Sequence, residues 1–192
     1  QEATPDSLKN TLAYYETSYM DRMAMNKENN RLNELRETAS PAFTSAGAEY
    51  GEYFLAKTKE AFSISASSKI DGIDLATKPI LEEAERARRF GFTPTEYDRA
   101  RANYLQAVES AYNERENTKS GSYVNEYVNN FLDKEPIPGI EVEYTLLNKL
   151  APNIPVEAVN QIMQQLITDI NEVVLLAGPE IEGVDYPSQV EI

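Results

Sequence analysis

Carboxylates are the abundant side chains of this sequence that could carry acid–base chemistry, and several of them lie close together. Glu82 and Glu83 are adjacent, and Glu114 stands two positions before Glu116. General acid–base catalysis needs two carboxyl groups in different environments, so that the pKa of one is raised. All four residues stand among polar neighbours, which favours solvated helix faces. A glycosidase-like enzyme, which needs two carboxyls facing each other across a cleft, therefore finds little support.

The sequence lacks the side chains on which much other enzyme chemistry depends. It contains no His and no Cys, which excludes imidazole or thiolate zinc sites, Ser-His-Asp triads and Cys-His dyads. Its 18 Lys and Arg against 32 Asp and Glu give a net charge of −14 over 192 residues. Because binding to nucleic acid depends on Lys and Arg, we expect no nucleic-acid partner. No apolar run approaches the roughly 20 residues of a membrane span, so we expect no span either.

The amino-terminal segment, residues 5–38, has the periodicity of a long amphipathic helix. Its apolar stripe consists of Leu8, Leu12, Tyr15, Tyr19 and Met23. A polar stretch at residues 26–30 interrupts the stripe and is a place where the helix can bend or break. Pro41 ends the segment, because the residue before a proline is pushed out of the helical region.

Residues 43–69 have the pattern of two antiparallel strands. Phe62, Ile64 and Ala66 alternate with serines, so they share one face of a strand. The aliphatic run at 171–177 is a further strand candidate that could complete a marginal two-stranded sheet. Helical segments precede and follow these strands. The sequence therefore predicts an α+β fold, in which several helices cover one face of an antiparallel sheet.

Local signals place the helices between the strands. We expect one helix to begin close to Pro79, where proline is tolerated, and to end at Gly91. Its expected inward residues are Ile80, Ala84 and Ala87, and its expected outward residues are Glu82, Glu83, Arg86 and Arg89. Thr93, Pro94 and Glu96 form the clearest helix start in the chain, a capping box with proline at the first helical position.

The later helices carry much of the chain's tyrosine. The helix after Pro94 presents one apolar face, made of Tyr97, Ala100, Tyr104, Ala107 and Ala111. Further helices are expected at 123–132, at 141–150 and after Pro155. At helical spacing the tyrosines, Tyr123 and Tyr127 among them, favour packing within the protein over a binding surface.

Several motifs in order along the chain resemble the insulinase-like (pitrilysin) zinc metallopeptidases. The run R-L-N-E-L-R-E at 31–37 is similar to a helix end in the family's non-catalytic domains, and G-F-T-P-T-E-Y-D-R-A-R at 91–101 is similar to another family segment. P-I-P-G-I-E at 136–141 looks like the long bacterial members, while L-A-P-N-I at 150–154 and V-V-L-L-A-G-P at 173–179 look like the family's closing motifs. The resemblance covers about residues 25–180.

The resemblance implies the second domain of a long bacterial member of the family, a domain that does not itself catalyse. The family's metal site is the motif H-x-x-E-H on another domain, and this chain has no His. The family therefore implies zinc for the parent protein, no cofactor in this chain, and an isolated chain that is inactive. Its implied partners are the catalytic and other domains of the same polypeptide and a peptide substrate. The implied location leans towards the bacterial cell envelope or periplasm.

Arg36 and Phe43 are the substrate-binding candidates that the resemblance supplies. The family's distal half carries an Arg followed seven positions later by a Tyr, and both help to hold substrate. Here Arg36 is followed seven positions later by Phe43. A guanidinium can grip a peptide carbonyl or carboxylate, whereas Phe43 has no hydroxyl to donate a hydrogen bond. An Arg that caps helix carbonyls or pairs with a Glu is the alternative.

The sequence thus predicts one non-catalytic peptidase domain over residues 1–180, followed by a tail or linker at 181–192. Its function would be structural, as part of the chamber that holds the peptide, while a neighbouring H-x-x-E-H domain hydrolyses the peptide bond. The alternative is a stand-alone module, a degenerate copy of the fold that acts as a binding partner or scaffold without a peptidase.

Overall fold

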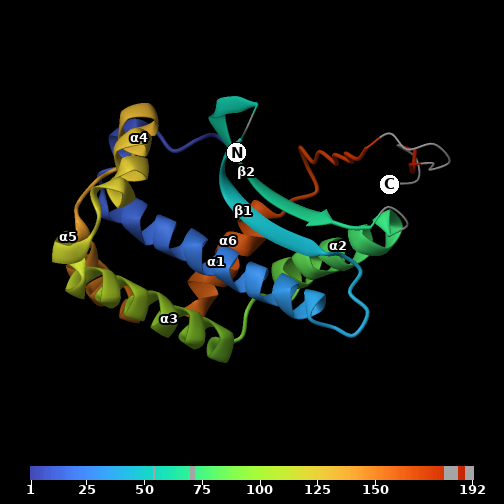
Figure 1. The fold of residues 1–192 in the computed structure, drawn as a ribbon, viewed down its shortest axis with the longest axis horizontal. Helices are drawn as coiled ribbons and strands as arrows, with labels where there is room; N and C mark the ends of the chain where they lie inside the picture. The colour runs from blue at the N-terminus through green and yellow to red at the C-terminus, as the bar shows by residue number, and fades with distance from the viewer. Residues whose placement is uncertain (54, 70–71, 180–185, 189–192) are drawn as a thin grey trace.

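A long central helix with a two-stranded sheet on one side and further helices on the others makes up the protein (Figure 1). The computed structural model describes residues 1–53, 55–69, 72–179 and 186–188. The main elements are α1 (Leu12–Arg36), β1 (Ser45–Tyr53), β2 (Ala56–Ser67), α2 (Ile73–Phe90), α3 (Pro94–Asn113), α4 (Val124–Asp133), α5 (Ile140–Leu150) and α6 (Val156–Leu166). None of the helices in the described ranges is long and apolar enough to cross a membrane.

Helix α1 runs without interruption through the polar stretch where a bend was expected. Thr11 caps its first turn by accepting a hydrogen bond from the Tyr14 amide at 3.2 Å. One polar side chain of this stretch, Asn29, has its partner in the sheet. Asn29 donates to the Ala48 carbonyl at 2.7 Å and accepts from the Ala48 amide at 2.9 Å, so it ties the middle of α1 to β1. The predicted apolar stripe is buried only in its second half, because Leu8 and Leu12 are exposed.

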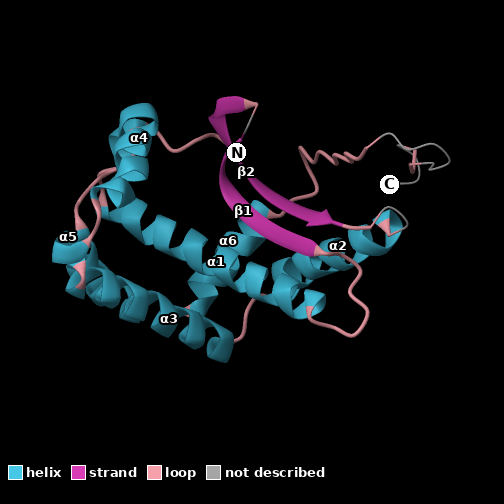
Figure 2. Ribbon diagram, in the orientation of Figure 1, coloured by secondary structure: helices cyan, strands magenta, loops and turns pink. Residues whose placement is uncertain are grey.

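Strands β1 and β2 form an antiparallel pair, with Ala48 opposite Ile64 and Tyr50 opposite Phe62. One face of this sheet covers α1 and α2 (Figure 2) through a buried apolar cluster. The members of this sheet cluster are Leu32, Phe43, Ala48, Ala76 and Ile80, with Phe62, Ile64 and Ala66 packed against them. The predicted α+β fold, with helices on one face of an antiparallel sheet, is therefore confirmed.

The predicted third strand at 171–177 is wrong. These residues lie outside any strand, and the side chain of Val173 is 74% exposed. Strand formation depends on packing against neighbouring strands and on burial. The aliphatic side chains of this late apolar segment have neither, since Val173, Val174 and Leu175 are all exposed.

Helix α2 begins at Ile73, so that Pro79 lies inside it and not near its start. Proline in a helix interior removes one hydrogen bond. Ala76 and Ile80, on either side of Pro79, both pack into the sheet cluster, and this burial holds both parts in one helix, because most helix stability in proteins comes from tertiary packing.

The second and larger core joins α1, α3, α5 and α6. Its buried members include Tyr19 and Met23 of α1, Tyr97 of α3 and Val159 and Met163 of α6. The expected capping box at Thr93 and the stop at Gly91, with φ +65°, are both present. In α3, however, Ala107 and Ala111 are exposed and Val108 is buried.

Candidate functional site

Arg36 and Phe43 lie in different environments. Arg36 is the last residue of α1 and is exposed. The ring of Phe43 is only 2% exposed and packs in the sheet cluster with Leu32 and Ala48. Phe43 therefore stabilises the contact between helix and sheet, and a substrate could reach its ring only if the cluster opened. Substrate contact by Arg36 and Phe43 stays a prediction.

Glu83 is the main correction among the carboxylates, because it points inward and is 5% exposed. Arg31 of α1 lies beside it, with Nη1 3.3 Å from the Glu83 carboxylate. Arg86 reaches the same carboxylate at 2.8 Å, and Arg89 pairs with Glu85 on the outer side of the helix. A buried carboxylate is tolerated when it is paired, and Arg31, 52 residues away in the chain, supplies that pairing.

Arg31 also binds the start of α3. Its Nε donates to Glu96 at 2.8 Å, and its Nη2 donates to the Glu96 carboxylate and to the Gly91 carbonyl, both at 3.0 Å. The hydrogen bonds from Arg31 and from Thr93 lower the pKa of Glu96 to about 2. One guanidinium thus joins α1 to α2 and α3, and we call Arg31, Glu83, Arg86 and Glu96 the Arg31 cluster.

The side chains of this chain do not fit a zinc ion of the family type. In the described ranges, no three acidic side chains come together in a way that could hold a metal ion, and the sequence has neither His nor Cys. Glu114 and Glu116 are exposed, as predicted for a solvated surface. The carboxylates of the Arg31 cluster are engaged by guanidinium groups, so the arrangement is suited to holding helices together.

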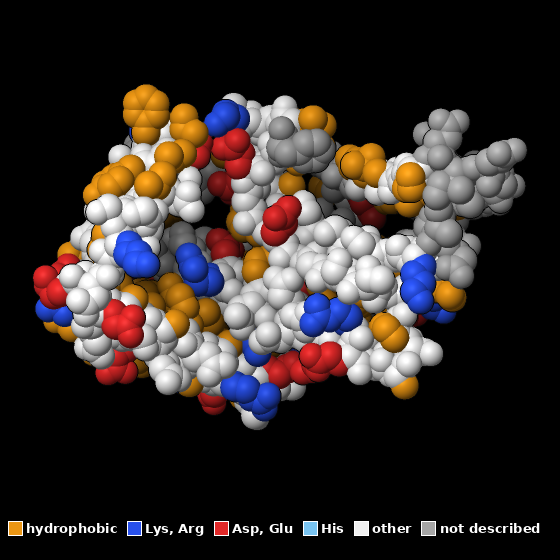
Figure 3. All heavy atoms as spheres, in the orientation of Figure 1, with side chains coloured by type: hydrophobic (Ala, Val, Ile, Leu, Met, Phe, Trp, Pro, Cys, Tyr) orange, Lys and Arg blue, Asp and Glu red, His pale blue; other side chains and the backbone are white. Residues whose placement is uncertain are grey.

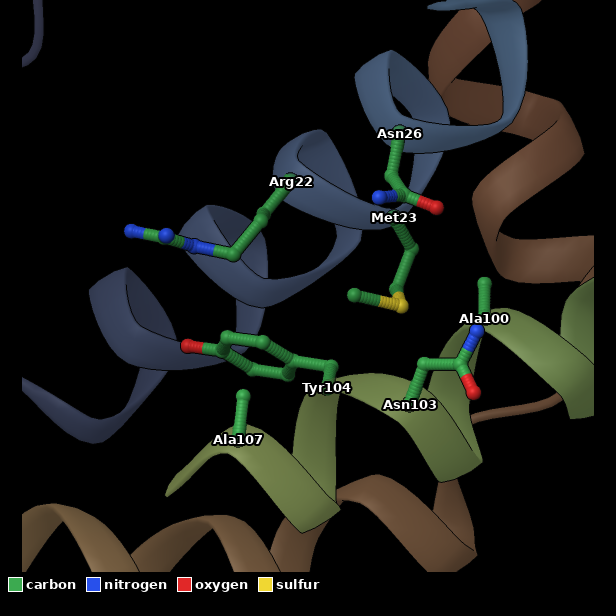
Figure 4. Close-up of a pocket in the computed structure, with 7 residues that line it drawn as sticks. All are labelled: Arg22, Met23, Asn26, Ala100, Asn103, Tyr104 and Ala107. Atoms are coloured by element: carbon green, nitrogen blue, oxygen red, sulfur yellow. The ribbon is translucent and has the colours of Figure 1, made fainter. Parts of the chain in front are cut away.

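A surface groove of about 250 Å³ lies between α1 and α3 (Figure 4). Its lining residues are Arg22, Met23, Asn26, Ala100, Asn103, Tyr104 and Ala107. The Arg22 guanidinium lies over the Tyr104 ring, 5.3 Å from its centroid, in a cation–π contact. The groove offers two side-chain amides and one guanidinium beside an apolar base.

Helix α4 exposes an entire apolar face. Tyr127 was expected to pack inside the protein, but its ring is exposed, and the ring of Phe131 is 76% exposed. The exposed residues follow helical spacing and define the α4 apolar face: Val124, Tyr127, Val128, Phe131 and Leu132. Figure 3 shows hydrophobic side chains gathered over this helix. An exposed contiguous apolar patch is typical of an interaction surface.

Two solved structures of one periplasmic protease share this fold. The first half of the periplasmic protease PqqL from Escherichia coli matches with a TM-score of 0.72 and 18% identity, over 82% of this chain and 33% of that one. The longer PqqL structure matches with a TM-score of 0.68 and 18% identity, over 81% of this chain and 17% of that one. At this identity the likeness shows the shared fold.

The sequence is similar to Zinc protease PQQL-like from Arabidopsis thaliana, with 37% identity over 95 residues. That match covers 50% of this chain and 10% of the relative. No family model matches the chain. The chain spans a third or less of the length of each of these relatives. Together these similarities confirm the resemblance to the insulinase-like (pitrilysin) zinc metallopeptidases.

Proposed function

We propose that this chain is a non-catalytic structural domain of a zinc metalloendopeptidase, and that it forms part of the chamber that holds the peptide substrate. A neighbouring domain of the same polypeptide, with the H-x-x-E-H motif, would hydrolyse the peptide bond. The observation that carries the proposal is the fold of PqqL in a chain without His or Cys. Zinc belongs to that neighbour, where it would activate water.

The exposed apolar surfaces support a role inside a larger polypeptide. The α4 apolar face and the late apolar segment both present aliphatic or aromatic side chains to solvent. Such surfaces are covered when domains pack against each other. We therefore propose that the α4 apolar face contacts another domain of the peptidase. Residues 1–180 would form the domain; most of the proposed tail, 181–192, lies outside the described residues.

A periplasmic or cell-envelope location is part of the same proposal. It is supported by the E. coli PqqL structures, which are described as a periplasmic protease.

Reconstitution tests the proposed function. The 192-residue chain is mixed with the His-bearing segment of its parent polypeptide, and hydrolysis of an unfolded peptide is followed. We expect activity only in the mixture, with zinc bound to the His-bearing partner. A partner with the Glu of H-x-x-E-H replaced by Gln serves as the inactive control.

Two results would overturn the proposal. One is peptide hydrolysis by the 192-residue chain alone that a chelator abolishes. The other is stoichiometric zinc retained by this chain after purification. A parent reading frame without any H-x-x-E-H segment would favour the stand-alone binding or scaffold module.

A further inference from the structure

Glu28, in the middle of α1, is a buried carboxyl group. Its side chain is fully buried, at 0% exposure. Neither of its carboxyl oxygens makes a hydrogen bond within the part of the chain that the structure describes. A buried carboxylate that lacks both a hydrogen bond and a cation of its own is strongly disfavoured, so such groups take up a proton.

The neighbouring charges are already balanced without Glu28. The groups that act on it are Arg31 from α1 and Glu83 and Arg86 from α2. Arg31 in turn binds Glu96 of α3. Two guanidinium groups therefore face two carboxylates in the Arg31 cluster, and an ionised Glu28 would add an unbalanced negative charge.

Among the residues that the structure describes, the other elements packed on this part of α1 supply no compensating cation to Glu28. On the sheet side, the contact is the uncharged pair of Asn29 with the Ala48 backbone. On the α6 side, the buried residues are apolar, Val159 and Met163. Lys27 is buried next to Glu28 in the sequence, but the charges that act on it are those of Glu96, Arg99, Arg31 and Glu34.

We propose that Glu28 is a proton-dependent latch: protonated, it allows the Arg31 cluster to join α1, α2 and α3, and ionised, it weakens that junction. An ionised Glu28 would repel Glu83 and compete with Glu83 and Glu96 for Arg31. Burial, followed by repulsion from Glu83, raises the pKa of Glu28 to about 7. This inference does not depend on the proposed peptidase role.

The direction of the pH effect follows from proton linkage. Because the pKa is raised in the folded state from an ordinary value of 4.5, the folded chain holds a proton that the unfolded chain releases. The contribution of Glu28 to stability therefore falls as pH rises from about 4.5 to 7, and it levels off above the folded pKa. The substitution Glu28→Gln keeps the shape of the neutral acid and removes the titration.

The test compares the unfolding equilibrium constants of wild type and Glu28→Gln by chemical denaturation at a series of pH values. We expect the ratio of wild type to variant to rise about tenfold per pH unit across this window. Asp21, whose pKa burial raises to about 7, contributes equally to both proteins and cancels in the ratio. Glu34→Gln, an exposed carboxylate on the same helix, is the matched control and should follow wild type. A ratio independent of pH overturns the latch.

If Glu28→Gln folds poorly, two further measurements on the wild-type protein can still test the proposal. An NMR titration of the Glu28 carboxyl carbon in wild type should have its midpoint near 7, and an ordinary midpoint near 4.5 would refute the buried acid. Hydrogen exchange at Gly91 and Phe92 reports the junction itself. After correction for intrinsic rates, these amides should open more often above pH 7 than below it, whereas unchanged opening would refute the loosening of the junction.

Discussion

Asn160 of α6 forms two hydrogen bonds with the backbone of Phe92, the residue that follows the α2 stop. The Phe92 amide donates to Oδ1 of Asn160 at 2.7 Å, and Nδ2 of Asn160 donates to the Phe92 carbonyl at 3.2 Å. A side chain thus satisfies both polar groups of a residue in the corner between α2 and α3. Since backbone groups of a partly buried corner need partners, Asn160 fixes this corner on α6.

Replacing Asn160 by Ala should destabilise the protein by about 1–3 kcal/mol, because the Phe92 amide and carbonyl would lose their partners. Chemical denaturation at fixed pH measures the change in the free energy of unfolding. Gln164→Ala, at an exposed position of the same helix, is the control and should change it by less than about 0.5 kcal/mol. Equal effects of the two substitutions would contradict the role of Asn160.

Gly91→Ala should also destabilise the protein, for two separable reasons. Gly91 has φ +65° and ψ −158°, a backbone region that is almost confined to glycine and costs other residues about 1–3 kcal/mol. A Cβ atom at Gly91 would also overlap the side-chain amide of Asn160. The control is Gly121→Ala, since Gly121 has open space around its Cα. In the background of Asn160→Ala the cost of Gly91→Ala should shrink but not vanish, because the backbone strain remains.

Removal of Arg31 should be among the most damaging substitutions in the chain. Arg31→Met leaves Glu83 and Glu96 without their shared guanidinium, and breaking a buried ion pair from one side costs about 3–5 kcal/mol. Adding Glu83→Gln should recover part of this loss, which a double-mutant cycle measures as a coupling energy. Arg36→Ala, at the exposed end of the same helix, should have little effect on stability. Strict additivity of Arg31→Met and Glu83→Gln would contradict their pairing.

Sequence reasoning succeeded where the signals are local. The capping box of Thr93 with Glu96 and the alternation of Phe62, Ile64 and Ala66 both depend on residues a few positions apart, and both are present in the structure. Gly91 likewise ends its helix where its special backbone freedom predicts.

The failures concern residues whose partners are distant in the chain. Glu83 was predicted to face solvent, because the residue that pairs with it, Arg31, is 52 positions away in the chain and gives no local signal. The polar stretch 26–30 resembled a break, although Asn29 there binds β1. The late apolar segment resembled a buried strand, but strand formation also needs an edge to pair with. Nothing in the sequence around Glu28 indicates that its side chain is buried.

The α4 apolar face yields a prediction about assembly. Phe131→Ser should leave the stability of the 192-residue chain unchanged within about 0.5 kcal/mol, because the ring is already exposed. In the mixture with the His-bearing partner, the same substitution should weaken association roughly tenfold or more, since truncating a buried interface aromatic has effects of this size. Titration calorimetry or a competition assay measures the affinity.

Phe90 supplies a matched control for that experiment. Its ring is 80% exposed at the end of α2, so Phe90→Ser removes an equally exposed aromatic from a different surface. If α4 is the contact, Phe90→Ser binds like wild type and Phe131→Ser does not. Equal losses would mean that exposed apolar area in general drives association, and equal retention would mean that the partner binds elsewhere. Either result would refute docking through α4, because only a difference between the two phenylalanines assigns the contact to that face.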